Sequence, residues 1–123
     1  MSEDVIEQIK QQIADHDILL YMKGSPRMPQ CGFSSRAVQI LVACGEKFAY
    51  VDILENPAIR ASLPKYANWP TFPQLWIRGE LIGGSDILAD LYEQGELQSM
   101  IKAAVRHESN EPETSSDDSA GQA

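Results

Sequence analysis

Apolar residues recur along the chain with two different spacings, which predict alternating helices and strands. Near the N-terminus, Val5, Ile9 and Ile13 repeat at a spacing of four and share one face of a helix. Ser2 is expected to cap that helix. The run 18–22, Ile-Leu-Leu-Tyr-Met, is short and continuously apolar, which is typical of a buried parallel strand.

The middle of the chain repeats this alternation of helix and strand. A second helix is expected from near Cys31 to Gly45, the residue type favoured just after a helix C-terminus. Residues 48–52 are predicted to form a second strand, and Asn-Pro at 56–57 marks the start of a third helix, which Pro64 is expected to interrupt or kink. The predicted inner face of the second helix consists of Ala37, Ile40, Leu41 and Cys44.

The last part of the chain contains a hairpin signal followed by two helical patterns. The segment 69–73 holds two prolines and is predicted to be a loop. Residues 74–77 and 81–83 flank a tight turn at 78–80, and Ser85 is expected to cap a fourth helix. The expected inward residues are Leu88, Leu91 and Tyr92 in this helix and Leu97, Ile101 and Val105 in a fifth.

This order of elements predicts an α/β protein with a small four-stranded mixed sheet flanked by helices on both faces. Strands joined by a helix are expected to be parallel, with a right-handed crossover. The final two strands are expected to form an antiparallel hairpin.

Charge separates the chain into two parts. The chain has 123 residues, a length that suits one domain. Residues 107–123 contain acidic residues, no Lys or Arg and almost no large apolar side chain, so we predict a disordered tail after a domain at 1–106. The net charge of the chain is −8, and five acidic residues of the tail account for five of these charges. The folded part is therefore still mildly acidic and lacks the basic surface of a nucleic-acid-binding protein.

The cellular setting bears on the two cysteines. No stretch approaches the roughly 20 apolar residues of a membrane span, and residues 1–13 lack a signal-peptide pattern. We therefore expect a soluble cytoplasmic protein. In that setting a disulfide between Cys31 and Cys44 is disfavoured, and a reactive or metal-binding thiol is the better hypothesis.

Cys31 is the residue with the strongest chemical signal. It stands where a loop meets a predicted helix, and a helix N-terminus stabilises a thiolate. Lys23, at the end of the first strand, adds positive charge nearby. The alternative, a buried inert cysteine, is disfavoured because Pro29, Gln30 and Gly32 are typical of an exposed loop.

No second thiol is placed to work with Cys31. The position three residues on is Ser34, which is able to donate a hydrogen bond but not to resolve a mixed disulfide. Cys44 lies thirteen residues along the same helix, about 19 Å away, beyond the roughly 7 Å limit between the Cα atoms of a disulfide. We interpret Cys44 as a core residue, so Cys31 must find its partner in another molecule.

Four sequence blocks carry a family resemblance. They are Met-Lys-Gly at 22–24, Cys-Gly-Phe-Ser at 31–34, Trp-Pro-Thr-Phe-Pro-Gln at 69–74 and Gly-Gly-Ser-Asp at 83–86. In this order they resemble monothiol glutaredoxins of the CGFS type, and the short single-domain bacterial form above all. The resemblance spans about residues 3 to 106 and implies a thioredoxin-like fold. One departure is Ser85, where many relatives have cysteine.

The resemblance implies a glutathione groove. Lys23 and Arg60 match the clamps for the glycine carboxylate, and Pro73 matches the family's cis-proline. The backbone at Ser85 and Asp86 suits the other carboxylate, with the Asp86 side chain on the ammonium group. From the residues alone, several have plainer readings: Arg60 as a solvated charge, Asp86 as a helix-dipole partner, Thr71 as a turn residue and Trp69 as core or groove wall. The full implied set is Lys23, Arg60, Thr71, Phe72, Pro73, Ser85 and Asp86.

The resemblance also implies an iron–sulfur role. A [2Fe–2S] cluster is usually held by four thiolates, and one chain offers only Cys31. Two chains and two glutathione molecules complete the set, so a cluster-bridged homodimer that passes the cluster to apo-proteins is expected, with a BolA-family protein as a further partner. The alternatives are a glutathione-dependent disulfide oxidoreductase acting through Cys31 and a non-catalytic redox-sensing adaptor.

Overall fold

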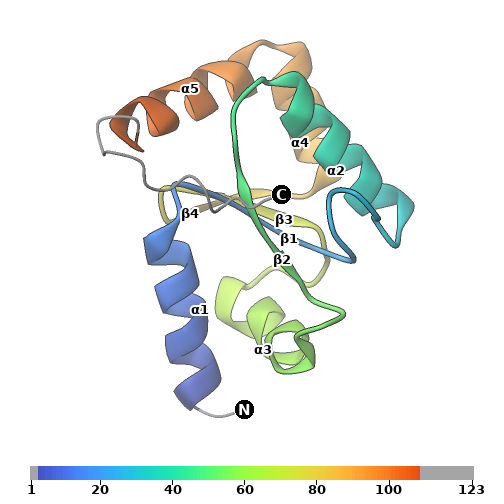
Figure 1. The fold of residues 1–123 in the computed structure, drawn as a ribbon, viewed down its shortest axis with the longest axis vertical. Helices are drawn as coiled ribbons and strands as arrows, with labels where there is room; N and C mark the ends of the chain where they lie inside the picture. The colour runs from blue at the N-terminus through green and yellow to red at the C-terminus, as the bar shows by residue number, and fades with distance from the viewer. Residues whose placement is uncertain (1–2, 109–123) are drawn as a thin grey trace.

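The computed structural model describes residues 3–108, and the predicted order of helices and strands is confirmed there (Figure 1). The predicted cap Ser2 lies outside the described residues. The elements are α1 (Glu3–Asp15), β1 (Ile18–Met22), α2 (Gly32–Ala43), β2 (Ala49–Asp52), α3 (Pro57–Ala67), β3 (Gln74–Ile77), β4 (Glu80–Gly83), α4 (Ser85–Glu93) and α5 (Glu96–Glu108).

The strands form one mixed sheet in the order β2-β1-β3-β4. β1 pairs in parallel with β2 and antiparallel with β3, and β3 forms the expected antiparallel hairpin with β4. The sheet and the five helices around it confirm the predicted thioredoxin-like α/β fold.

One expected strand direction is wrong. β2 and β3 are joined by α3, yet β3 runs antiparallel to β1 and therefore also to β2. The register gives the reason. Asp52, at the end of β2, pairs with Met22, and Gln74, at the start of β3, pairs with the adjacent Tyr21. The connection through α3 leaves and re-enters the sheet at the same end, so β3 must run back.

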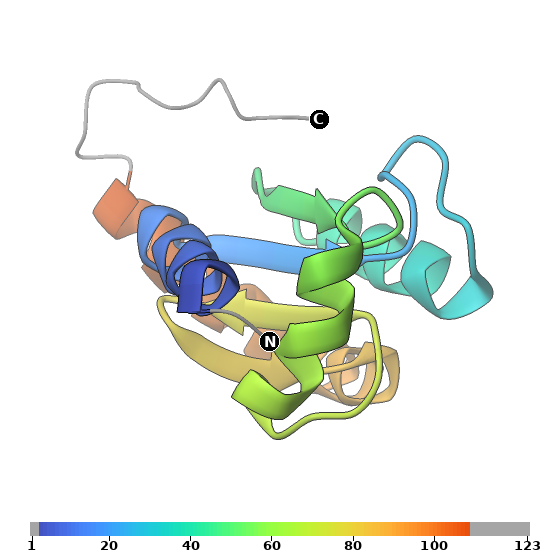
Figure 2. The same ribbon diagram turned by 90° about the horizontal axis from the view of Figure 1, so that it is seen from below.

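Alternate residues of β1 supply two cores, one on each face of the sheet. Ile18, Leu20 and Met22 pack in a cluster with buried residues of α2, α4 and α5. Leu19 and Tyr21 pack in a second cluster with α1 and α3. Figure 1 shows the sheet between these two layers, and Figure 2 shows α1 and α3 together on one face. Helices on both faces are therefore confirmed.

Three details of the predicted elements need correction. α3 runs without interruption through Pro64, because the buried side chains of its inner face, Ile59 and Leu63, hold it against the sheet. The residue that caps α4 is Gly84, and Ser85 is already its first helical residue. The hairpin turn is only two residues long, Arg78 and Gly79, with φ angles of 51° and 84°.

The domain boundary also shifts. α5 continues to Glu108, so His107 and Glu108 belong to the last helix and not to the tail. The remainder of the predicted tail, 109–123, lies outside the described residues.

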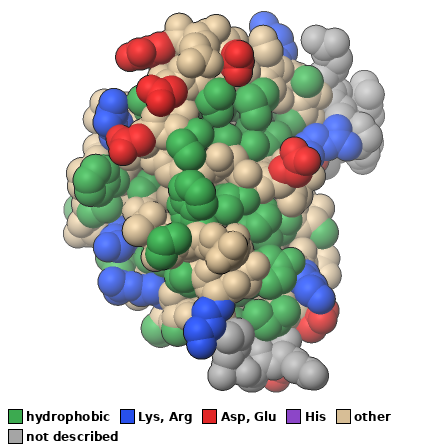
Figure 3. Space-filling model, turned by 180° about the vertical axis from the view of Figure 1, so that it is seen from behind, with side chains coloured by type: hydrophobic (Ala, Val, Ile, Leu, Met, Phe, Trp, Pro, Cys, Tyr) green, Lys and Arg blue, Asp and Glu red, His purple; other side chains and the backbone are tan. Residues whose placement is uncertain are grey.

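Between residues 3 and 108, no helix is long and apolar enough to cross a membrane. On the face seen from behind, hydrophobic side chains occupy the middle and charged ones the rim (Figure 3).

Candidate functional site

The loop between β1 and α2 brings Cys31 next to the end of β1. The N–H of Gln30 donates to the carbonyl of Lys23 at 2.9 Å, which closes the loop at its base. The N–H of Gly24 donates to Asp52 Oδ1, also at 2.9 Å. Gly24 has a φ of +91°, and a Cβ there would meet the backbone of Met28, so this position requires glycine.

Cys31 caps α2 and is held by Ser34. The N–H of Ser34 donates to Cys31 Sγ at 3.3 Å, and Ser34 Oγ lies 3.5 Å from the same sulfur. Ser34 is fully buried, and its Oγ accepts from the N–H of Lys23 at 3.1 Å. The S–H of the Cys31 thiol donates to Ser34 Oγ, and once that proton is lost the Ser34 hydroxyl is able to donate to the thiolate instead.

These contacts favour the thiolate of Cys31. Partial burial raises the pKa of the thiol, but hydrogen bonds from the Ser34 side chain and from the backbone at Ser34 and Phe33 lower it, as does the positive charge of Lys23. The net result is a pKa below the ordinary value of a cysteine. A half-exposed thiolate of this kind is suited to be a nucleophile or a metal ligand.

Cys44 has the opposite environment. It caps the other end of α2 and packs against the apolar cluster of α2, α4 and α5. Burial raises the pKa of its thiol. Both cysteines are free, and Cys44 lies at the opposite end of α2 from Cys31, partly buried at the edge of the core and not fully inside it as predicted.

A groove of about 740 Å³ opens beside Cys31. All seven residues that the sequence predicted for glutathione binding line this groove. Cys31 itself is not part of the lining, but the adjoining Lys23 and Phe33 are. The lining residues are Lys23, Phe33, Arg60, Pro64, Trp69, Pro70, Thr71, Phe72, Pro73, Gly84, Ser85, Asp86 and Ile87.

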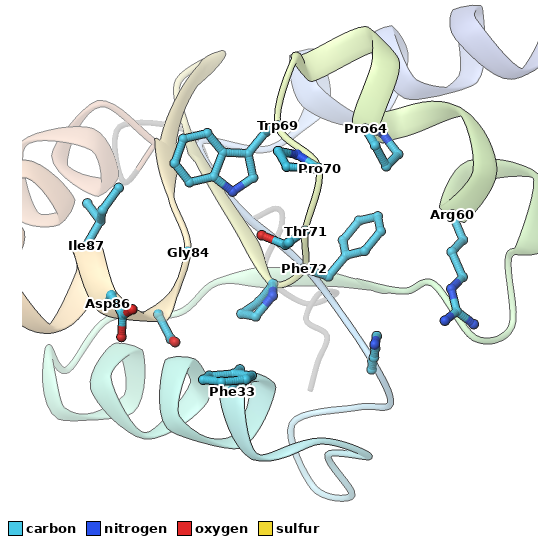
Figure 4. A pocket seen from close by; sticks show the side chains of 13 residues that line it. Phe33, Arg60, Pro64, Trp69, Pro70, Thr71, Phe72, Gly84, Asp86 and Ile87 are labelled. Atoms are coloured by element: carbon cyan, nitrogen blue, oxygen red, sulfur yellow. The ribbon is translucent and has the colours of Figure 1, made fainter.

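Opposite charges lie at opposite ends of the groove. Figure 4 shows Arg60, from α3, at one end and Asp86, from the start of α4, at the other, with Thr71 and Phe72 between them. The N-terminus of α4 has no side-chain cap, so its backbone N–H groups remain available to an anion. Phe72-Pro73 is a cis peptide bond, as the match to the family's cis-proline implied.

Asp86 differs from the expectation in one respect. Its Oδ1 lies 3.5 Å from Nη1 of Arg36 on α2, and both side chains are more than half exposed. A ligand cation that reaches Asp86 therefore competes with an existing ion pair. Nothing in the sequence pattern pointed to this pair, because fifty residues separate its members.

Sequence reasoning also missed apolar residues of the groove, Phe33 and Ile87 among them. Phe33 falls on the same helical stripe as the buried Ala37, yet its ring is 62% exposed and forms one wall. Ile87, at 36% exposure, contributes from α4. The sequence is compatible with Trp69 either as a core residue or as a wall of the groove, and the structure places it in the groove wall (Figure 4). Its indole N–H is buried without a hydrogen-bond partner among the described residues.

Comparison with known proteins gives a consistent result. The family model described as Glutaredoxin matches residues 18–82. Glutaredoxin 4 of Escherichia coli strain K12 is 66% identical over 109 residues, which cover 88% of this chain and 95% of that protein. Glutaredoxin 4 of Haemophilus ducreyi is 58% identical over 105 residues, covering 85% and 98%.

Solved structures agree with the sequence matches. Reduced apo GrxS14 from poplar superimposes with a TM-score of 0.72 at 43% identity, covering 83% of this chain and 94% of that one. A buckwheat glutaredoxin–glutathione complex has the same fold, with a TM-score of 0.74 at 20% identity, covering 85% and 97%. With one thiol at the head of α2 and serine in place of the second, the chain belongs to the glutaredoxin family as a monothiol member.

Proposed function

We propose that this protein binds glutathione in the groove and carries a [2Fe–2S] cluster between two copies of the chain, for delivery to apo-proteins. The observation that supports this most is the position of Cys31. Its thiol has a lowered pKa, lies beside a charged groove and has no second cysteine in reach. Such a thiol needs a partner from outside the chain.

The charges of the groove suit glutathione. This tripeptide has two carboxylates and one ammonium group. Lys23 provides a cation near the thiol and Arg60 a second cation in the groove, and the uncapped N-terminus of α4 provides another anion-binding position, with Asp86 for the ammonium. The groove lies in the fold that the buckwheat protein shares, and that protein was solved with glutathione.

The donor set explains why the cluster would need two chains. Among the residues that the structure describes, no three His, Cys, Asp or Glu side chains come together to hold a metal ion. Each chain offers the thiolate of Cys31, so two chains and two glutathione molecules would give the four sulfur ligands that such clusters use. The cluster is then cargo rather than a resident cofactor. A BolA-family protein in place of one chain would share it in the same way.

Anaerobic reconstitution with iron, sulfide and glutathione tests this proposal. We expect the visible absorption of a [2Fe–2S] cluster in the unmodified protein and in Cys44→Ala, and none in Cys31→Ser. Melting curves check that both variants fold. A folded Cys31→Ser protein that still binds the cluster would contradict the proposal.

A second candidate is supported by the lowered pKa of Cys31. The thiolate would attack the glutathionyl sulfur of a mixed disulfide, releasing the protein thiolate and leaving Cys31 joined to glutathione. A second glutathione thiolate would then displace Cys31 and form oxidised glutathione. Turnover of a glutathionylated peptide by the cluster-free protein measures this activity, and turnover as fast as that of a dithiol glutaredoxin would make it the main function.

A further inference from the structure

Gln74 is a fully buried polar side chain at the start of β3 with three hydrogen bonds. Its amide nitrogen donates to the carbonyl oxygen of Trp69 at 3.1 Å and to that of Thr71 at 3.3 Å. Its amide oxygen accepts from the indole N–H of Trp76 at 3.2 Å. Each polar atom of this amide therefore has a partner in a region without solvent.

Trp76 determines which way the amide points. An indole nitrogen only donates, so the atom of Gln74 that faces it must be the oxygen. The amide nitrogen then faces the loop. Trp76 is itself 8% exposed in the core between the sheet, α1 and α3, and its ring lies 6.4 Å from that of Tyr66. The orientation of Gln74 is thus set by packed groups of the fold.

The loop held in this way forms one wall of the groove. Residues 69–73 all line it (Figure 4). Two of them are prolines, which have no N–H to donate. Hydrogen bonds to the carbonyls of Trp69 and Thr71 therefore fix the loop at two points, on either side of Pro70.

We propose that Gln74 is the positioning residue of the glutathione groove, oriented by Trp76. Gln74 does not line the groove and would not touch the ligand. It acts by holding the loop so that Thr71 and Phe72 present their backbone to the peptide. This inference rests on the proposed function, because it takes glutathione as the ligand of the groove.

Three substitutions separate the parts of this arrangement. Gln74→Met keeps the length of the side chain and removes both donors, so glutathione affinity should fall about tenfold. Gln74→Glu keeps the acceptor for Trp76 but turns a carboxylate toward two carbonyls, so a larger loss is expected. Trp76→Phe removes the donor that fixes the amide of Gln74, so the amide is free to rotate by half a turn. An intermediate loss of glutathione affinity is expected.

Gln98→Met is the matched control. Gln98 is a half-buried glutamine on α5 whose amide donates to the carbonyl of Tyr92 at 3.3 Å, and it is not part of the groove. Its loss should leave glutathione affinity unchanged, because Gln98 makes no contact with the groove. Isothermal titration calorimetry gives the dissociation constant, and NMR reports the amide shifts of Thr71 and Phe72 in the free protein.

The outcomes are distinct. Weaker glutathione binding with shifted Thr71 and Phe72 amides in the Gln74 variants, but not in Gln98→Met, supports the inference. Unchanged affinity in folded Gln74→Met, with wild-type binding intact, overturns it and leaves the proposed function standing. If the wild-type protein does not bind glutathione, both fail. If Gln74→Met does not fold, Trp76→Phe decides by the same two measurements.

Discussion

At the scale of single residues, the chemistry of the site depends on how Ser34 divides its hydrogen bonds. Its oxygen accepts from the N–H of Lys23 and from the S–H of Cys31, and in the thiolate form its hydroxyl is able to donate to Cys31 Sγ. The residue that replaces a second cysteine is therefore not a passive substitute. It ties the end of β1 to the start of α2 and favours the thiolate at the same time.

The first prediction concerns Ser34→Ala. The variant removes the hydroxyl contact to Cys31 and leaves the N–H of Lys23 without its acceptor, so the pKa of Cys31 should rise toward the ordinary value. Loss of the acceptor for this part-buried donor should also cost about 1 kcal/mol of unfolding free energy. The rate of alkylation against pH measures the first effect, and denaturant unfolding measures the second.

The sign of this pH dependence follows from the direction of the shift. A lowered pKa keeps Cys31 reactive at pH values where an ordinary cysteine is protonated, and reactivity is lost as the pH falls through that pKa. Measured in Cys44→Ala, the midpoint should lie below the value of a free cysteine in an unstructured peptide measured under the same conditions. Cys44, measured in Cys31→Ser, should titrate above that value because burial raises its pKa. The reverse order would contradict this account.

The second prediction concerns the charges of the groove. Lys23→Ala and Arg60→Ala should each weaken glutathione binding about tenfold, the loss typical of a charge-assisted hydrogen bond. Asp86→Asn should weaken it less, because the ligand ammonium must displace Arg36 from Asp86. Calorimetric titration measures all three, with Lys102→Ala, an exposed residue of α5, as the control. An Asp86 loss larger than that of Lys23 would contradict this order.

At the scale of elements, three connections at the same end of the sheet build the site. The loop from β1 to α2 carries Cys31. The connection from β2 through α3 to β3 carries Arg60 and the loop 69–73, and the step from β4 to α4 carries Asp86. They meet because β1 and β2 end together, at Met22 and Asp52, and β3 begins beside them. The direction of β3 that the sequence rule missed is thus what brings the groove to the thiol.

The third prediction concerns Asp52, which links the loop after β1 to the end of β2 by hydrogen bonds. Its Oδ1 accepts from the N–H groups of Gly24 and Leu54, each at 2.9 Å. Asp52→Ala should lower the unfolding free energy by about 1–3 kcal/mol and loosen the loop before Cys31. Hydrogen exchange of the Gly24 amide checks the local effect. Asp90→Ala, an exposed carboxylate on α4, should change neither quantity.

At the scale of the whole molecule, residues 3–108 form one sheet with its covering helices and offer one thiol with a lowered pKa, so the proposed task requires association. The fourth prediction is that gel filtration shows a dimer only when glutathione and the cluster are both present. Reconstitution with dithiothreitol in place of glutathione should give a poor or altered cluster, because half of the sulfur ligands are then missing. A stable holo-dimer without glutathione would contradict the ligand count.

Local sequence signals were sufficient for most of the architecture. The spacing of four in α1, the apolar run of β1 and the turn at Arg78 and Gly79 depend on residues close together in the chain, so they could be read without a structure. The same holds for Cys31, whose place at a helix start and whose neighbour Ser34 are local facts. The family resemblance added the groove residues, six within the four blocks and Arg60 outside them, and all seven line one cavity.

Other features arise from contacts between distant segments, which no local pattern encodes. The direction of β3 depends on where α3 returns to the sheet, and the ion pair of Arg36 with Asp86 depends on how α2 packs beside α4. The uninterrupted course of α3 through Pro64 depends on the core beneath it. The role of Gln74 appears only when its donors and acceptor are seen together, because a buried amide takes its orientation from the groups packed around it.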